Sequence, residues 1–282
     1  MRWLYLLFLL LPAQAPADVL TLEPPVVDTG GVALLRWHGE PPSEAVARFN
    51  GRLYNLRSAP QGILALLGTD LELTPGNYPV EVTVVDSRGK AESFHLRLEV
   101  RQAVRAEERL TLPPAKVTPT DPAVLKRIGE ERALLADLFS RQLTPPLWES
   151  FAHPVADPVG SPFGLRRILN GQPKSPHAGV DFRSAAGTPV RAAARGTVAF
   201  AGDLFYTGQT VILDHGEGLF SLYAHLQTIN CSRGQLLAAG TVLGRVGSTG
   251  RSSGPHLHWG VKLRGDRVDP LALTELLGRE KR

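Results

Sequence analysis

The stretch SSGPHLHWGVKL, residues 252 to 263, decides the fold of the C-terminal half of this chain. Successive side chains of a β-strand point to opposite faces. Alternation from residue 257 therefore puts four apolar side chains on one face, those of Leu257, Trp259, Val261 and Leu263. His256 and His258 fall on the other face, with their α-carbons about 6.6 Å apart. The stretch predicts a strand that buries one face in a core and directs two imidazoles at one site.

Two other fragments carry polar residues that can join this site. In LFSLYAHL, residues 219 to 226, alternation puts His225 on the same face as Tyr223, opposite an apolar face. In SPHAGVDF, residues 175 to 182, the proline and the glycine argue against a helix, so His177 and Asp181 should span a loop that enters a strand. Catalytic zinc commonly has three imidazole or carboxylate ligands and one open position. His177, Asp181 and one histidine of the 256/258 pair meet that requirement.

The sequence around these fragments predicts a mainly β protein with two β-domains joined by a short helix. YPVEVTVVD and FHLRLEV alternate apolar and polar residues on either side of the turn signal DSRGK, which predicts a hairpin. We therefore assign residues 18–101 to a small immunoglobulin-like β-sandwich. Residues 102–150 read as a polar, proline-rich linker with a helix at about 122–141, capped by Asp121 and begun by Pro122. Residues 151–282 are rich in glycine and short strands, and form a second, antiparallel β-domain.

The N-terminus has the pattern of an export signal. Residues 1–17 comprise Arg2, an apolar run of nine residues and a small-residue stretch that ends in Ala15-Pro16-Ala17, as in a cleavable signal peptide. The run is far shorter than the roughly 20 residues that span a bilayer. We expect export to the periplasm or cell envelope, or secretion, with no stable membrane span after signal removal.

Composition limits the remaining classes of function. The formal net charge of +4 is small and scattered, so we expect no nucleic-acid partner. The single cysteine, Cys231, excludes an internal disulfide framework and a zinc site of the finger type.

HAGVD, YAHL and GPHLHW, in this order, resemble the signature of the M23 (LytM or lysostaphin-type) zinc metallopeptidases. The resemblance covers residues 151 to about 272. It implies a Zn²⁺ cofactor and an endopeptidase that hydrolyses peptide bonds in peptidoglycan stem peptides or crossbridges during cell-wall remodelling. Transferred residue by residue, it makes His177, Asp181 and His258 the metal ligands and His225 and His256 the catalytic imidazoles. One imidazole would take a proton from water and the other would stabilise the oxyanion, in an order that the sequence leaves open.

Two further residues are candidates for contact with substrate. Arg166 in FGLRR stands where the family has an arginine near the site, and it either binds a substrate carboxylate or braces a loop. Tyr223 either lines the groove beside His225 or fills space in the core.

Three alternatives remain at this point. The first is a non-catalytic LytM-type regulator that binds and activates a cell-wall amidase, although such proteins typically lose metal ligands. The second is a structural or adhesion protein whose N-terminal domain carries the function. The third concerns regulation, because the linker at 102–150 is long enough to dock over the zinc site. The sequence identifies no protein regulator.

Overall fold

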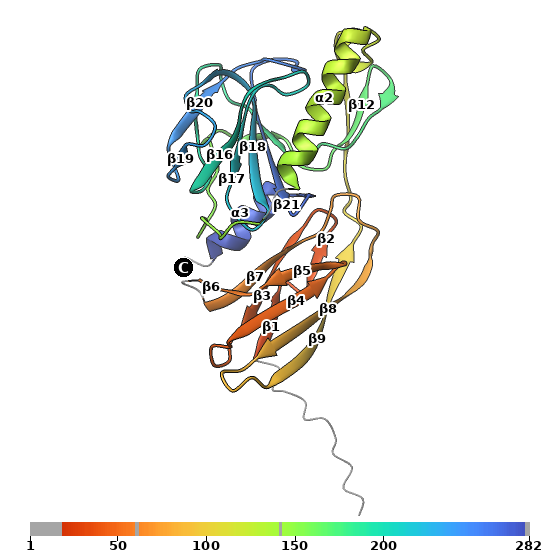
Figure 1. Cartoon of the computed structure of the whole chain (residues 1–282). Helices are drawn as coiled ribbons and strands as arrows, with labels where there is room; N and C mark the ends of the chain where they lie inside the picture. Colours follow the sequence, from red (N-terminus) through yellow and green to blue (C-terminus); the bar gives the residue numbers. More distant parts are fainter. Residues whose placement is uncertain (1–18, 60–61, 141–142, 280–282) are drawn as a thin grey trace, which may run out of the picture.

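The computed structural model describes residues 19–59, 62–140 and 143–279, and these fold as two β-domains joined end to end (Figure 1). The mainly β class predicted from the sequence is confirmed. The predicted signal peptide, residues 1–17, lies outside the described residues. Within the described ranges no helix combines the length and the apolar character that crossing a membrane requires.

The N-terminal domain is a sandwich of two sheets, as predicted. The first sheet has the order β1-β3-β7-β6, formed by β1 (Leu20–Glu23), β3 (Val32–Trp37), β7 (Gly62–Gly68) and β6 (Arg57–Ala59). The second has the order β2-β9-β8-β4-β5, formed by β2 (Val26–Asp28), β9 (Ala91–Arg101), β8 (Gly76–Val85), β4 (Glu44–Phe49) and β5 (Arg52–Asn55). The predicted hairpin is β8–β9, whose Val80, Val82 and Leu98 are buried between the sheets. The relation to immunoglobulin domains stays a prediction.

The first sheet is buried on both faces, which explains why β3 reads VALLRW rather than alternating with polar residues. Leu35 and Leu67 face the interior of the sandwich. Leu34 and Leu66 point the other way and join the core of the C-terminal domain. One apolar core therefore runs across the junction between the domains.

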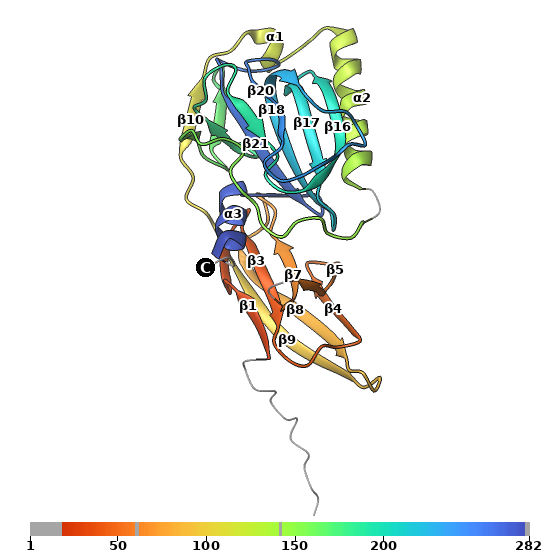
Figure 2. The same cartoon turned by 90° about the vertical axis from the view of Figure 1, so that its left-hand side faces the viewer.

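Ion pairs at the same junction fix the two domains together. Both Arg267 and Arg57 cross it: Arg267 donates to both carboxylate oxygens of Asp70, and Arg57 Nε lies 3.3 Å from Glu217 Oε2. Figures 1 and 2 show the sandwich against one end of the C-terminal domain, beside α3 (Pro270–Arg279). The opposite end of that domain is left uncovered by the sandwich.

The segment predicted to be a linker is more ordered than expected. It contains β10 (Glu107–Leu110), α1 (Pro114–Val117) and α2 (Pro122–Phe139). α2 begins as predicted, since the Asp121 side chain accepts a hydrogen bond from the Ala123 N–H at 2.8 Å. Its Leu138 packs on Ile212 and Phe220, so the helix covers an outer sheet face of the C-terminal domain rather than bridging the two domains.

The C-terminal domain is built on a ten-stranded antiparallel sheet. Its main order is β11-β14-β21-β18-β17-β16-β19, with β15, β20 and β22 paired at its margins. The strands are β11 (Val159–Ser161), β14 (Val180–Phe182), β15 (Pro189–Arg191), β16 (Gly196–Leu204), β17 (Gly208–Asp214), β18 (Leu219–Ile229), β19 (Leu236–Leu237), β20 (Val242–Val246), β21 (Leu257–Leu263) and β22 (Asp266–Val268). A small sheet, β10-β12-β13, lies beside it, with β12 (Arg166–Leu169) and β13 (Gln172–Pro173). In this sheet β10 pairs in parallel with β12.

Candidate active site

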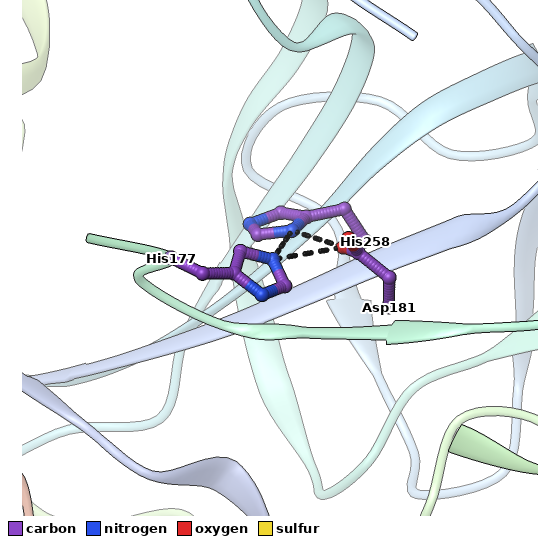
Figure 3. A group of neighbouring side chains, drawn as sticks. All are labelled: His177, Asp181 and His258. Atoms are coloured by element: carbon purple, nitrogen blue, oxygen red, sulfur yellow. Dashed lines mark hydrogen bonds and ion pairs between the residues drawn. The ribbon is translucent and has the colours of Figure 1, made fainter. Parts of the chain in front are cut away.

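His177, Asp181 and His258 converge on one point in the C-terminal domain (Figure 3). His177 Nε2 lies 2.9 Å from Asp181 Oδ1 and 2.9 Å from His258 Nδ1. His258 Nδ1 lies 2.7 Å from the same oxygen of Asp181. Within the described part of the chain, this is the group of histidine, cysteine and acidic side chains whose ligand atoms come within 4.8 Å of one another.

Strand pairing and a glycine bring these three residues together. β14 pairs with β21 so that Asp181 lies directly opposite His258, and His177 precedes β14 on a loop, as the sequence predicted. Gly179, between them, passes under the His258 ring. A Cβ at residue 179 would lie 2.5 Å from the Trp259 carbonyl oxygen and 2.8 Å from His258 Cε1. The close approach of β14 to β21 therefore requires glycine at this position.

The donor atoms of this cluster are oriented by a second layer of polar contacts. His177 Nδ1 lies 2.9 Å from the Pro162 carbonyl oxygen, so the proton sits on Nδ1 and the Nε2 lone pair faces the cluster. Arg167 Nη2 donates to Asp181 Oδ2 at 2.8 Å, which leaves Oδ1 toward the two imidazoles. Such contacts fix the tautomer and orientation of metal ligands in other proteins.

His225 reaches this cluster because β18 contains a β-bulge. Between the pairs that Tyr223 and Leu226 make with β17, two residues of β18, Ala224 and His225, lie opposite one residue of β17. His225 adopts a φ of 61°. The bulge turns its ring to 4.7 Å from the His256 ring, between centroids. The prediction that His225 shares the face of Tyr223 is thus wrong, because strand alternation does not continue through a bulge.

His256 and His225 are held in the same way. His256 precedes β21 and its Nδ1 lies 2.8 Å from the Gly254 carbonyl oxygen. His225 Nδ1 lies 2.8 Å from the Thr249 carbonyl oxygen. In both residues the Nδ1–H donates to the backbone, so Nε2 is left free for chemistry. His256 Nε2 lies 4.0 Å from Asp181 Oδ1, and 20% of its side chain is exposed.

Burial and hydrogen bonding favour neutral imidazoles at His225 and His258 beside an ionised Asp181. Burial, together with the neighbouring His258 and His256, lowers the pKa of His225 to about 3. Burial lowers the pKa of His258 to about 4, despite the contact with Asp181. Burial alone would raise the pKa of Asp181, but hydrogen bonds from His177 and His258 outweigh it and hold that pKa well below its usual value. Neutral imidazole and carboxylate are the protonation states in which these groups bind a metal.

A groove of about 800 Å³ runs past this cluster. Its walls include His225 and His256 together with Arg251, Ser252, Arg183 and Glu108. Glu108 belongs to β10, so the segment between the domains forms part of the wall. Its described residues line the groove without filling it. Among residues 102–140 and 143–150, the docking over the site that we considered from the sequence is therefore not seen.

Tyr223 does not line the groove. Its side chain is fully buried, and its hydroxyl accepts a hydrogen bond from the Ala193 N–H at 2.8 Å. The hydroxyl also lies 2.9 Å from Ser221 Oγ, which is 2.7 Å from His215 Nε2. The ring packs in the core, paired across the sheet with Trp259. Of the two roles left open for Tyr223, the structure supports core packing and contradicts substrate contact.

The arginine that contacts the cluster is Arg167, not Arg166. The Arg166 side chain is exposed, whereas Arg167 donates to Asp181 and, through Nε at 3.0 Å, to Glu108 Oε2. Glu108 also accepts a hydrogen bond from Ser161 Oγ at 2.6 Å. Arg167 and Glu108 were missed from the sequence. The pairing of Glu108 with Arg167 across β10 and β12 is the signal that identifies them, and it joins residues 59 positions apart.

Comparisons with known proteins point to one family. The sequence model of peptidase family M23 matches residues 175–270. A crystal structure of a candidate M23 peptidase from Pseudomonas aeruginosa is 32% identical, with a TM-score of 0.66, and the match covers 88% of this chain and 95% of that one.

Two curated relatives match part of this chain. DD-carboxypeptidase/endopeptidase Mpg of Neisseria meningitidis is 40% identical over 116 residues, which are 41% of this chain and 27% of the relative. Peptidoglycan DD-endopeptidase ShyA of Vibrio cholerae is 37% identical over 97 residues, which are 34% of this chain and 23% of the relative. The matched region thus spans about a quarter of the length of each relative.

Proposed function

Because the chain belongs to peptidase family M23, we propose that it is a zinc-dependent endopeptidase that hydrolyses peptide bonds in peptidoglycan. The observation that carries the proposal is the convergence of a His-Asp-His cluster with two further imidazoles, each presenting a free Nε2 at one groove. The two histidines of the cluster would not support the proposal without the two further imidazoles, and the reverse also holds.

His177, Asp181 and His258 suit a zinc ion. Two imidazole nitrogens and one carboxylate oxygen are the donor set of many catalytic zinc sites, and three protein ligands leave a position open. His177 Nε2 and Asp181 Oδ1 are each aimed at the common point by a partner on their other polar atom. Zinc bound there would polarise the scissile carbonyl and make a water molecule acidic enough to attack near neutral pH.

The two remaining histidines supply proton transfer and charge stabilisation. His225 can take a proton at Nε2, because its Nδ1–H is already donated to the Thr249 carbonyl oxygen and Nε2 carries the lone pair. His256 is the more exposed of the two and lies at the groove surface, where its ring can stabilise the oxyanion that forms from the scissile carbonyl. This assigns the general base to His225 and oxyanion stabilisation to His256.

The names of two relatives support the proposed substrate and a location outside the cytoplasm. The two are named peptidoglycan DD-endopeptidase or DD-carboxypeptidase/endopeptidase, and each is similar to less than half of this chain. Action on peptidoglycan requires a location outside the cytoplasm, which agrees with the signal peptide predicted at residues 1–17.

Incubation of the purified full chain with peptidoglycan tests this proposal. We expect soluble fragments whose masses correspond to addition of water across a peptide bond, and their loss when zinc is removed by a chelator. Binding to peptidoglycan or to an amidase without new peptide ends would instead support the regulator alternative. Fragments that appear equally with and without zinc would overturn the proposed chemistry.

A further inference from the structure

Arg251 places a cation in the wall of the groove that holds the cluster. It lies on the loop between β20 and β21, and it lines the same groove as His225, His256 and Asp181. The same loop supplies the carbonyl groups of Thr249 and Gly254 that orient the two catalytic imidazoles. The loop therefore fixes the position of Arg251 relative to the imidazoles of His225 and His256.

The Arg251 guanidinium is held in place before any ligand binds. Its Cζ lies 4.6 Å from the centroid of the Tyr206 ring, and its backbone N–H donates to the Tyr206 carbonyl oxygen at 2.8 Å. The preceding Gly250 has a φ of 72°, and a Cβ there would lie 2.3 Å from the Gly208 nitrogen. The loop thus packs backbone against backbone on the β16–β17 turn.

Arg251 has no acidic partner among the residues that the structure describes. Arg167, the arginine nearest the cluster, is neutralised by Glu108 and Asp181. Burial lowers the pKa of Arg251, and the charge of Arg167 lowers it further. A guanidinium remains charged at neutral pH even so. A half-buried cation without a counter-ion favours an anionic ligand in the groove.

We propose that Arg251 forms a subsite for a carboxylate of the peptide substrate, at a fixed spacing from the scissile bond. This rests on the proposed endopeptidase function and specifies its substrate class: peptides that carry a free carboxylate near the cleaved bond. A planar guanidinium can donate two parallel hydrogen bonds to a carboxylate, whereas a carboxamide offers one acceptor and no charge. The carboxylate is either the C-terminal group or a side-chain group of the peptide.

Matched synthetic peptides test the subsite on the zinc-loaded full chain. One series carries the free carboxylate at the C-terminus or on a side chain, and the other carries a carboxamide at the same position. We expect kcat/KM to favour one free acid over its carboxamide by about tenfold or more, since charge-assisted hydrogen bonds are about twice as strong as neutral ones. The position that shows the preference identifies the source of the carboxylate.

Arg251→Gln should reduce this preference to near unity, mainly by raising KM for the free acid. Arg251→Lys should retain part of the preference. Arg233→Gln, which removes an exposed arginine outside the groove, should retain all of it. Equal rates for acid and carboxamide in the wild type, or an unchanged preference in Arg251→Gln, would overturn the inference.

A binding measurement separates this inference from the proposed function. If the wild type cleaves no peptide at all, the endopeptidase proposal fails, and calorimetry on the full chain then decides the subsite. Tighter binding of the free acid that is lost in Arg251→Gln supports the subsite. Equal binding of acid and carboxamide refutes it.

Discussion

Substitution of Tyr223 by phenylalanine separates a role in the core from a role in the groove. The tyrosine hydroxyl accepts a hydrogen bond from the Ala193 N–H and lies beside Ser221 Oγ, and all three residues are buried. Phenylalanine keeps the ring, so the substitution removes one oxygen atom and creates no large cavity. The Ser221 hydroxyl still has His215 as a partner.

The cost of this substitution follows from the group that is left without a partner. The Ala193 N–H would become a buried donor with no acceptor, which costs about 1–3 kcal/mol. We therefore expect Tyr223→Phe to lower the free energy of unfolding by about 2 kcal/mol. We also expect zinc content and kcat/KM to stay at the wild-type level at temperatures where the variant is folded.

Urea unfolding followed by tryptophan fluorescence measures the loss of stability, and peptide cleavage measures the activity. Tyr78→Phe is the control, because its hydroxyl donates to Thr74 at the surface of the sandwich, and its loss should cost about 1 kcal/mol or less. A Tyr223→Phe protein of wild-type stability with reduced kcat/KM would refute the buried role and return Tyr223 to the substrate groove.

Two further predictions concern groups outside the metal cluster. Glu108→Ala should lower kcat/KM by about tenfold, because Arg167 loses the carboxylate that holds it against Asp181. The control, Glu107→Ala at the adjacent exposed residue, should leave kcat/KM unchanged. Equal losses of kcat/KM in the two variants would contradict this prediction. Burial lowers the pKa of His215 from 6.5 to about 4. Above pH 6.5 this histidine is neutral in both the folded and the unfolded protein, so its full contribution to the free energy of unfolding is present there. That contribution, about 3 kcal/mol, is lost as pH falls through 4; an NMR titration that places this pKa near 6.5 would contradict it.

The sequence predicted the directions of the side chains correctly in strands with regular alternation. Alternation in β21 correctly buried Leu257 and Trp259 and put His258 in the cluster, with His256 beside it. The same rule failed in β18, because a bulge at Ala224 shifts the alternation by one residue before His225 is reached. A bulge inserts a residue without a distinctive local sequence, so it becomes visible only when both paired strands are known.

The contribution of the linker could not be predicted for a related reason. EERL, residues 107–110, is polar and short, and nothing in it marks a strand. It becomes a strand because β12 offers an edge with which it can pair. This pairing also determines that Arg167, and not Arg166, points toward Asp181. Contacts between segments far apart in the sequence thus determine which arginine faces Asp181, and the local sequence pattern does not.

Zinc content and peptide-bond cleavage, measured together on the wild type, His258→Ala and His256→Ala, test the central claim most directly. We predict that the wild type binds stoichiometric zinc and cleaves peptidoglycan peptides. His258→Ala should lose both zinc and cleavage. His256→Ala should keep zinc and lose cleavage by about 100-fold or more, as expected for removal of a catalytic imidazole. Wild-type protein without zinc, or His258→Ala protein that still cleaves at the wild-type rate, would contradict the account.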